Sequence, residues 1–513
     1  MVAATLAVAL ACHARAFAAA PPPEGCEASK LNGAAGAALR TVKCHATAAR
    51  FGLPVDATCL DAADRKVDVA FRHAEARPCV SHDDAPAIAA TLTALAAEVA
   101  ASVGGGPSRC DQRMLLAAGK HLQATLKAQS VHAAAPESQK LATLLAKRDA
   151  KFAARAASAE SAADCTHAGN APAVAALLDA RSSDVVDAVR GTLRGVAART
   201  GRRIGAAVRA NVLASDEAAY RDVIVRQFDA LTAEYEFMWG NMEPTRGTYV
   251  LGPIDTIVAF AQQHALPLKG APLVWHLILP PWVNDGMTAT ELQTAVDERI
   301  DGLVSAYAGT VATWDVVNEA VVDSGAAFRD SIFLQKLGPD YIRNAFVRAR
   351  QADPAALLFY NDFLADGVNA KSDFIYGMIV DLLAQGTPID GMSFQMHLGG
   401  GFGAPPTRES VRQNLQRFAD LGLVVRISEM DVQRTGTVSS AADRLAQQRI
   451  VYHDMVAACR DVAACDSVTF WGVSDAHTWV KDYLGVMDAP LPYDEQYQPK
   501  AAFFGIRDAL LGF

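Results

Sequence analysis

From about residue 201 onward, short runs of β-prone hydrophobic residues alternate with longer segments whose apolar positions recur at helical spacing. Helix-like segments such as 291–308, 340–352 and 441–458 lie between the short runs. The eight predicted strands are Arg203–Val212, Leu231–Glu236, Leu268–Trp275, Ala312–Asn318, Leu357–Asn361, Gly391–Gln395, Val424–Ser428 and Ser467–Phe470. Eight strand–helix alternations predict an α/β fold, a (β/α)8 TIM barrel. A doubly wound open sheet is the rival, but no glycine-rich phosphate loop follows the first strand.

The first two hundred residues are rich in Ala and have a purely helical pattern. The predicted helices cover residues 86–103, 111–129, 138–163 and 172–199. We therefore expect a small all-α domain over residues 21–198, followed by a barrel domain over residues 199–513. All six Trp and all eleven Tyr lie after residue 200, so the helical part lacks the aromatic faces on which sugars stack. A spacer role, or docking of a partner or the cell surface, suits it better, and it resembles no family that we recognise.

The overall composition excludes some classes of protein. Hydrophobic residues make up 51% of the 513 residues and charged residues 20%, as in a globular protein. The net charge of −9 argues against a nucleic-acid partner, because phosphate binding needs clustered Lys and Arg. No uninterrupted apolar run of about 18 residues follows the N-terminal segment, so we expect no integral membrane segment beyond it.

The N-terminal segment has the pattern of a secretory signal. Residues 2–12 form a short apolar run, small residues continue to Ala20, and three prolines follow. We predict a signal peptide over residues 1–20 and a secreted, periplasmic or cell-surface protein, although the usual basic residues before the apolar run are missing. Cys12 is a weak candidate for a lipoprotein anchor, and a buried N-terminal helix is the structural alternative.

Removal of this segment leaves eight cysteines, and an even number in an exported chain indicates disulfides. Cys459 and Cys465 lie close together and far from the rest, so we expect them to pair. The six in the helical part allow 15 pairings, and the sequence does not choose among them. No two cysteines have the C-x-x-C spacing of zinc or redox sites, and we expect neither a metal nor a cofactor.

Polar residues are concentrated where the predicted strands end, which is where TIM barrels carry their catalytic residues. A carboxylate is costly to bury there without a partner or a function. Two glutamates on separate strands that face one cleft fit the paired-carboxylate mechanism of glycoside hydrolysis. The strand-end residues are Glu234, Glu236, His276, Asn318, Glu319, Asn361, Asp362, Gln395, His397, Glu429 and Asp431.

Five motifs in this order resemble those of the family 10 glycoside hydrolases, the endo-β-1,4-xylanase family, along nearly all of residues 201–513. Residues 314–320 (WDVVNEA) look like the acid/base motif, and residues 427–432 (ISEMDV) look like the nucleophile motif. The other three are residues 273–276 (LVWH), 394–398 (FQMHL) and 471–475 (WGVSD). Cys459 and Cys465 match a disulfide that is common in the family.

The resemblance implies a retaining double displacement in which Glu429 is the nucleophile and Glu319 is the acid and base. The two carboxyl groups would lie about 5–5.5 Å apart, with a raised pKa for Glu319 and an ionised Glu429. By the same resemblance, His397 binds Glu429 and is oriented by Asp431, with further support from Asn318, which binds the sugar 2-hydroxyl, and from Gln395. The substrate-binding residues would be Glu234, Tyr235, Met238, Trp275, His276, Trp471 and Trp479.

Four positions depart from the family, at Tyr235, Met238, Ala271 and Ile278, where it usually has Asn, Lys, His and Gln. In the family these four residues bind sugar hydroxyls on the non-reducing side of the scissile bond. Each lost neutral hydrogen bond costs about 0.5–1.5 kcal/mol, so binding of unsubstituted xylan should weaken. We therefore expect a preferred glycan other than plain xylan, or weak action on xylan.

Three alternatives remain at this point. The glutamates and His397 could be structural ion-pair or core residues, although their motifs favour catalysis. The barrel could be a catalytically weak or inactive protein that only binds glycan, since fold does not guarantee function. A metal-dependent hydrolase is the weakest alternative, because His276, His397 and Asp431 lack the spacing of metal ligands.

Overall fold

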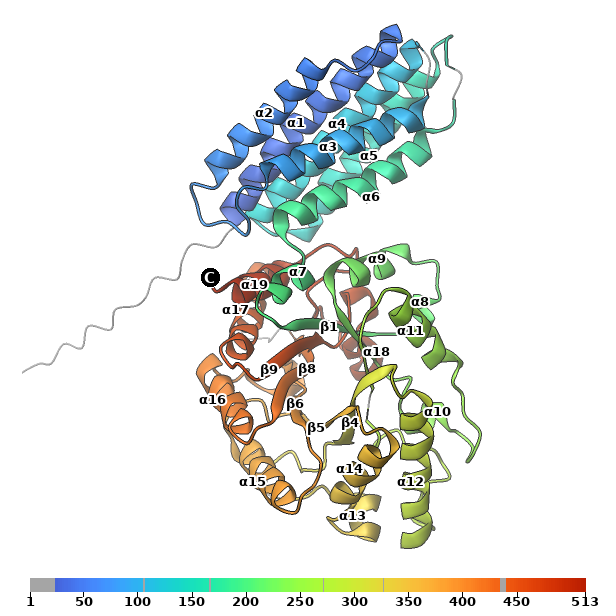
Figure 1. Ribbon diagram of the computed structural model, residues 1–513, viewed down its shortest axis with the longest axis vertical. Helices are drawn as coiled ribbons and strands as arrows, with labels where there is room; N and C mark the ends of the chain where they lie inside the picture. The colour runs from blue at the N-terminus through green and yellow to red at the C-terminus, as the bar shows by residue number, and fades with distance from the viewer. Residues whose placement is uncertain (1–23, 105–106, 166–167, 271, 326, 434–439) are drawn as a thin grey trace, which may run out of the picture.

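The computed structural model describes residues 24–104, 107–165, 168–270, 272–325, 327–433 and 440–513. It has two parts, an elongated bundle of helices and a barrel with the bundle stacked against its side (Figure 1). The signal peptide predicted over residues 1–20, Cys12 and Ala271 lie outside the described residues.

Eight parallel strands close into a barrel, which confirms the predicted TIM fold. The ring runs β1–β2–β3–β4–β5–β6–β8–β9, and β9 pairs with β1, for example at Val468 and Ile204. A two-residue strand, β7 (His397–Leu398), extends the β6 segment and pairs with the far end of β8. The eight strands are β1 (Arg203–Val208), β2 (Ala230–Ala233), β3 (Leu268–Gly270), β4 (Val311–Asn318), β5 (Leu357–Asp362), β6 (Gly391–Phe394), β8 (Val424–Val432) and β9 (Cys465–Phe470).

Helices surround the barrel and bury apolar side chains against it. Inside the barrel, the paired strands β3 and β4 lie so close together that a Cβ on Gly270 would be 2.1 Å from the ring of Trp314, so only glycine fits there. The outer helices are α9 (Ala218–Gln227), α11 (Gly252–Gln263), α12 (Ala289–Ala306), α14 (Tyr341–Ala352), α15 (Ala370–Ala384), α16 (Arg408–Ala419), α17 (Ala441–Arg460) and α19 (Ala501–Leu511). Short helices in the loops are α8 (Ala210–Leu213), α10 (Trp239–Met242), α13 (Ile332–Leu337) and α18 (Trp479–Leu484).

The first three strands are shorter than the sequence predicts. β1 ends at Val208, β2 at Ala233 and β3 at Gly270, whereas the predicted strands continue for three to five further residues. Beyond these points the backbone leaves the ladder, and Val274 keeps only an isolated bridge to Val317. The polar residues that follow these strands therefore lie on loops at the carboxyl end of the barrel, where Arg209 and Glu234 line a cleft.

As far as the structure describes it, the N-terminal region is a bundle of six helices with three disulfides, Cys26–Cys79, Cys44–Cys59 and Cys110–Cys165. Two of the helices, α1 and α2, were not among the predicted ones; α2 buries Val67 and Phe71 on one face, a helical pattern that the sequence did contain. The helices are α1 (Glu24–Phe51), α2 (Ala57–Ala74), α3 (Ala85–Val103), α4 (Arg109–Ala134), α5 (Ser138–Glu160) and α6 (Ala171–Arg190). Among the described residues, only α3 is long and apolar enough to cross a membrane by composition, and its Leu92, Leu95 and Val99 are buried in the bundle core.

The predicted helix over residues 172–199 is broken at Gly191, whose φ of 79° lies in the left-handed region. The next helix, α7 (Leu193–Arg199), packs Leu193 and Val196 into the core of the barrel. The last strand is preceded by a fourth disulfide, Cys459–Cys465, which joins the end of α17 to the start of β9.

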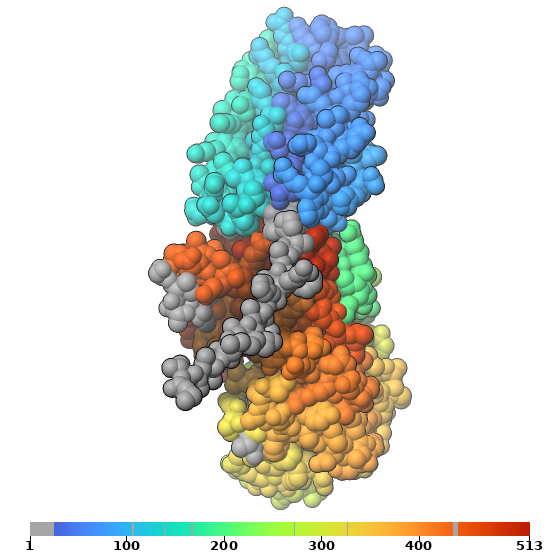
Figure 2. Space-filling model, turned by 90° about the vertical axis from the view of Figure 1, so that its left-hand side faces the viewer, coloured from blue at the N-terminus to red at the C-terminus, as the bar shows by residue number. Residues whose placement is uncertain are grey.

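A buried ion cluster joins the bundle to the barrel. Glu27 of α1 binds both Arg190, at 2.7 Å, and Arg507 of α19, at 2.5 Å, and all three side chains are almost fully buried. Nearby, His132 Nε2 lies 2.7 Å from the Pro499 carbonyl oxygen. The bundle therefore contacts the outer side of the barrel at α7 and α19, and Figure 2 shows it continuing the long axis of the molecule. Within the described residues, none that lines the cleft comes from the bundle.

Candidate active site

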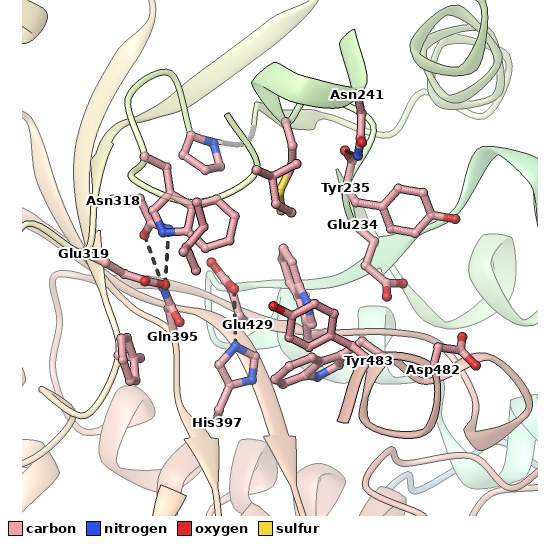
Figure 3. A pocket seen from close by; sticks show the side chains of 18 of the residues that line it. Glu234, Tyr235, Asn241, Asn318, Glu319, Gln395, His397, Glu429, Asp482 and Tyr483 are labelled. Atoms are coloured by element: carbon pink, nitrogen blue, oxygen red, sulfur yellow. Dashed lines mark hydrogen bonds and ion pairs between the residues drawn. The ribbon is translucent and has the colours of Figure 1, made fainter. Parts of the chain in front are cut away.

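A cleft of about 520 Å³ opens at the carboxyl ends of the strands. Figure 3 shows Glu319 at one end of this cleft, Glu429 near its middle, and Glu234 and Asp482 at the other end. Of the residues predicted for the site, those that line it are Glu234, Tyr235, Met238, Trp275, Asn318, Glu319, Gln395, His397, Glu429, Trp471 and Trp479.

Glu319 follows the last residue of β4 and has a φ of 55°, a left-handed conformation that is uncommon outside glycine. Such strain costs of order 1–3 kcal/mol and is typical of functional sites. Its carboxylate accepts a hydrogen bond from Gln395 Nε2 at 2.9 Å and another from the Trp275 indole. Burial raises the pKa of Glu319 above its ordinary value, and the charges of Asp362 and Glu429 add to the rise. These features fit a proton donor.

Glu429 lies on β8, where the pairing with β9 is irregular between Ile427 and Met430. Burial favours its neutral form, but hydrogen bonds from His397 and Asn361 and the positive charge of Lys269 outweigh burial and lower the pKa of Glu429. Asn361 Nδ2 donates to Glu429 Oε1 at 2.7 Å. The pKa of Glu429 is thus lowered while that of Glu319 is raised, so Glu429 loses its proton at a lower pH than Glu319.

His397 connects Glu429 to Asp431. Its Nε2 lies 3.4 Å from Glu429 Oε2, and its Nδ1 lies 2.9 Å from Asp431 Oδ2. Burial opposes a charge on His397, but the two carboxylates outweigh it and raise the pKa of His397 to about 10. Trp479 Nε1 donates to the same Asp431 oxygen at 2.6 Å. Glu429 and Asp431 thus hold the imidazolium of His397 from its two nitrogens.

A network of side-chain amides fills the space between the two glutamates. Asn361 Nδ2 lies 2.9 Å from the Asn318 amide, and Gln395 Nε2 lies 3.1 Å from it. Ser428 Oγ in turn donates to Asn361 Oδ1 at 2.8 Å. Asn361 was noted only as a strand-end residue in the sequence, although it is in contact with Glu429. Its position directly before the end of β5 was the signal that could have placed it in the site.

The end of the cleft away from Glu319 contains an arginine that the sequence motifs did not identify. Arg209, just after β1, donates to both carboxylate oxygens of Glu234, at 2.7 and 2.8 Å, and also binds Asp482 of α18. Burial opposes the charge on Arg209, but the bonds to Glu234 and Asp482 outweigh it and raise the pKa of Arg209 further. Tyr235, Met238 and Ile278 line this part of the cleft.

His276 is the one predicted substrate-binding residue that does not line the cleft in the part of the chain that the structure describes. It lies behind Glu319 in a small hollow beside Arg329 and Tyr341. Burial lowers the pKa of His276 to about 4, and the charge of Arg329 contributes. A neutral ring in this position can support the backbone near Glu319 but does not face the cleft.

Within the described residues, one group of carboxylates and imidazoles is spaced to hold a metal ion, at His121, Asp149 and Asp179 of the helical bundle. Arg148 lies in the group, with nitrogens 2.7 Å from Asp149 and 2.9 Å from Asp179. A guanidinium already provides the positive charge there, so this group does not resemble a metal centre.

Comparison with known proteins identifies the barrel. The model of glycosyl hydrolase family 10 matches residues 192–509. The chain belongs to this family. It is therefore a glycoside hydrolase, as its motifs predict, and the helical region before residue 192 lies outside the match.

Several relatives of the chain have the name endo-1,4-beta-xylanase. Endo-1,4-beta-xylanase B of Thermotoga neapolitana is 38% identical over 299 residues, which is 58% of this chain and 84% of the relative. Endo-1,4-beta-xylanase of Agaricus bisporus is 38% identical over 282 residues, 55% of this chain and 83% of the relative. The crystal structure of xylanase 10B from Thermotoga petrophila in complex with xylobiose is 37% identical, with a TM-score of 0.59, and the match covers 62% of this chain and 97% of that one.

Proposed function

We propose that this family 10 enzyme is a retaining, endo-acting β-glycosidase that hydrolyses xylan or a related plant-type β-glycan by double displacement. One observation carries the proposal: two buried glutamates in one cleft have pKa values shifted in opposite directions, upward for Glu319 and downward for Glu429. The xylanase relatives support the choice of substrate class.

The reaction follows from these two environments. The Glu429 carboxylate attacks the anomeric carbon while Glu319 gives its proton to the departing glycosidic oxygen, so the C–O bond breaks and a glycosyl-enzyme forms. Glu319, now a carboxylate, takes a proton from water, and the hydroxide oxygen displaces Glu429 with net retention. Retention requires carboxyl groups about 5–5.5 Å apart, and this separation of Glu319 and Glu429 stays a prediction.

The finer part of the proposal is that the glycone side, where the non-reducing part of the substrate binds, differs from that of plain xylanases. Both oxygens of Glu234 already accept hydrogen bonds from Arg209, which reduces what this carboxylate offers to sugar hydroxyls. Tyr235, Met238 and Ile278 present mainly apolar surface nearby. These features support a glycan with a more apolar or substituted face than linear xylan.

The test compares initial rates on linear xylan with those on a panel of substituted xylans and other β-glycans. Glu319→Gln and Glu429→Gln variants serve as blanks, because an amide keeps the shape of the side chain but can act neither as a carboxylic acid nor as a carboxylate nucleophile. We expect a substituted or different β-glycan to be cleaved faster than linear xylan. If linear xylan is cleaved at least as fast as every other substrate, the altered specificity is wrong.

The alternative function is a barrel that binds glycan and cleaves it weakly or not at all. The observation that favours it is that Arg209 already donates to both carboxylate oxygens of Glu234. A mechanism-based fluoroglycoside separates the two. Labelling of Glu429, located by peptide mass spectrometry, would support the hydrolase. Absence of labelling, where a family 10 xylanase treated in parallel is labelled, would support the binding protein.

We propose in addition that the protein is exported. The four disulfides support this, because disulfides persist in oxidising compartments and are rare in the cytosol. The docking role expected for the helical bundle stays a prediction.

A further inference from the structure

One charged group lies at the end of the cleft away from Glu319 and consists of Arg209, Glu234 and Asp482. A series of side-chain contacts connects this group to Glu429. Arg209 is 8% exposed and follows β1, whereas the Asp482 side chain is 54% exposed and belongs to α18, which follows β9. Because β1 and β9 are neighbours in the barrel, the ion pair ties the α18 loop to the floor of the cleft. Glu234 holds Arg209 with two bonds, so the guanidinium is fixed before Asp482 binds it.

The short helix α18 has contacts at both ends. Trp479 begins it, and its indole donates to Asp431 at 2.6 Å, while Asp482, one turn later, binds Arg209. A helix of six residues is not stable alone in water, so these external contacts set its position. In addition, Thr478 caps its first turn by accepting from the Val480 N–H at 3.3 Å.

We propose that Arg209 and Asp482 are positioning residues for the nucleophile: they fix α18 so that Trp479 holds Asp431, Asp431 holds His397, and His397 aligns Glu429. Each step of this path is a contact in the structure, from Arg209–Asp482 to Trp479–Asp431, His397–Asp431 and His397–Glu429. The glycone end of the cleft and the reacting carboxylate are thereby mechanically linked. The proposal rests on the function proposed above only where hydrolysis is the readout.

The first experiment needs no activity. Full-length protein carrying 15N-tryptophan gives one indole signal for each Trp, and the Trp479→Phe variant identifies the signal of Trp479. In Asp482→Ala we expect this signal to move and its exchange with water to accelerate at least severalfold. Lys481→Ala, an exposed neighbour on the same helix, is the matched control and should leave the signal unchanged. An unchanged Trp479 signal in Asp482→Ala would overturn the proposal.

The second experiment measures hydrolysis against pH. Asp482→Ala should lower kcat severalfold and move the acidic limb of the profile to higher pH, because Glu429 loses alignment with His397. Asp482→Glu, which keeps the carboxylate, should recover much of the loss. Trp479→Phe should move the acidic limb in the same direction, and the double variant should move that limb no further than either single one, because both act through one contact. Additive effects would contradict the route through Trp479, whereas an inactive wild type would contradict the proposed function and leave the indole result standing.

Discussion

The His397 imidazole lies 3.4 Å from the Glu429 carboxylate, so a positive charge sits beside the proposed nucleophile in a buried site. The pKa of His397, raised to about 10 by Asp431 and Glu429 against the effect of burial, keeps that charge through the acidic and neutral range. Glu429 in turn has a lowered pKa despite burial, and the hydrogen bond from His397 is the main stabilising cause. The two residues therefore titrate as a pair in which each supports the charge of the other.

The first prediction concerns the pH profile of His397→Asn. Activity requires ionised Glu429 and is lost as the pH falls through the pKa of that residue. Without the imidazolium, burial dominates and the pKa of Glu429 rises, so the acidic limb of kcat/KM should move upward by about one unit, which corresponds to about 1.4 kcal/mol. The basic limb, which reports loss of the proton from Glu319, should stay in place and serves as the internal control. An acidic limb that does not move would contradict this role of His397.

The second prediction separates the roles of the two glutamates. Glu319→Ala removes the proton donor, so cleavage of a natural glycan should fall by about 10²–10⁴-fold. A dinitrophenyl glycoside needs no protonation to leave, so formation of the glycosyl-enzyme from it should fall far less. Azide should then restore turnover and give the β-glycosyl azide, identified by NMR. An α-azide would show inversion and would contradict the retaining mechanism.

The eight strands of the barrel were predictable because short β-prone runs alternate with longer helix-like segments along residues 201–513. The ends of β1, β2 and β3 were placed too late, since polar residues that leave the ladder follow directly on apolar runs. In the helical region, the cysteine pairing depends on which helices are neighbours. Because the helices share similar Ala-rich faces, the sequence alone does not show which of them pack together. Cys26–Cys79 and Cys110–Cys165 each join residues more than fifty positions apart.

Sequence motifs placed Glu319 and Glu429 in one cleft, which both residues line. Glu319 directly follows β4, as expected, whereas β8 continues to Val432, beyond its predicted end, so that Glu429 lies inside the strand. Arg209 and Asp482 were missed because they are 273 residues apart and meet only when the barrel closes with β1 beside β9. His276 was included for its strand-end position, yet the chain turns after Trp275 and places the ring behind Glu319. A one-dimensional pattern identifies the strand end but not the direction in which a loop residue points.

The third prediction tests the altered glycone side by restoring polar groups. The double variant Tyr235→Asn, Met238→Lys provides two donors where the cleft wall is now apolar. Two new hydrogen bonds of about 0.5–1.5 kcal/mol each should raise kcat/KM on linear xylo-oligosaccharides by about 5- to 150-fold. Leu277→Ala, which trims another apolar residue of the same cleft, is the control and should not reproduce the gain. No gain in the double variant would mean that these positions do not limit xylan binding.

The last prediction concerns the junction between the bundle and the barrel. Burial raises the pKa of Glu27, but Arg190 and Arg507 outweigh it and hold that pKa below the ordinary value, so the carboxylate is ionised in the folded protein. Its contribution to stability is therefore present above the pKa of an unfolded glutamate and is lost as the pH falls through the folded value. Glu27→Gln removes the shared charge from two buried guanidinium groups, which should cost about 3–5 kcal/mol near neutral pH.

Glu98→Gln is the matched control, because Glu98 pairs with Arg181 at 2.9 Å on the exposed surface of the same bundle. An exposed pair of this kind contributes about 0–1 kcal/mol to the free energy of unfolding, so the Tm of this variant should be close to that of the wild type. Calorimetry at neutral pH should show a clearly lower Tm for Glu27→Gln alone, and the difference between the two variants should shrink at low pH, where Glu27 takes up a proton. Equal stability of both variants at neutral pH would mean that the buried cluster does not hold the bundle on the barrel.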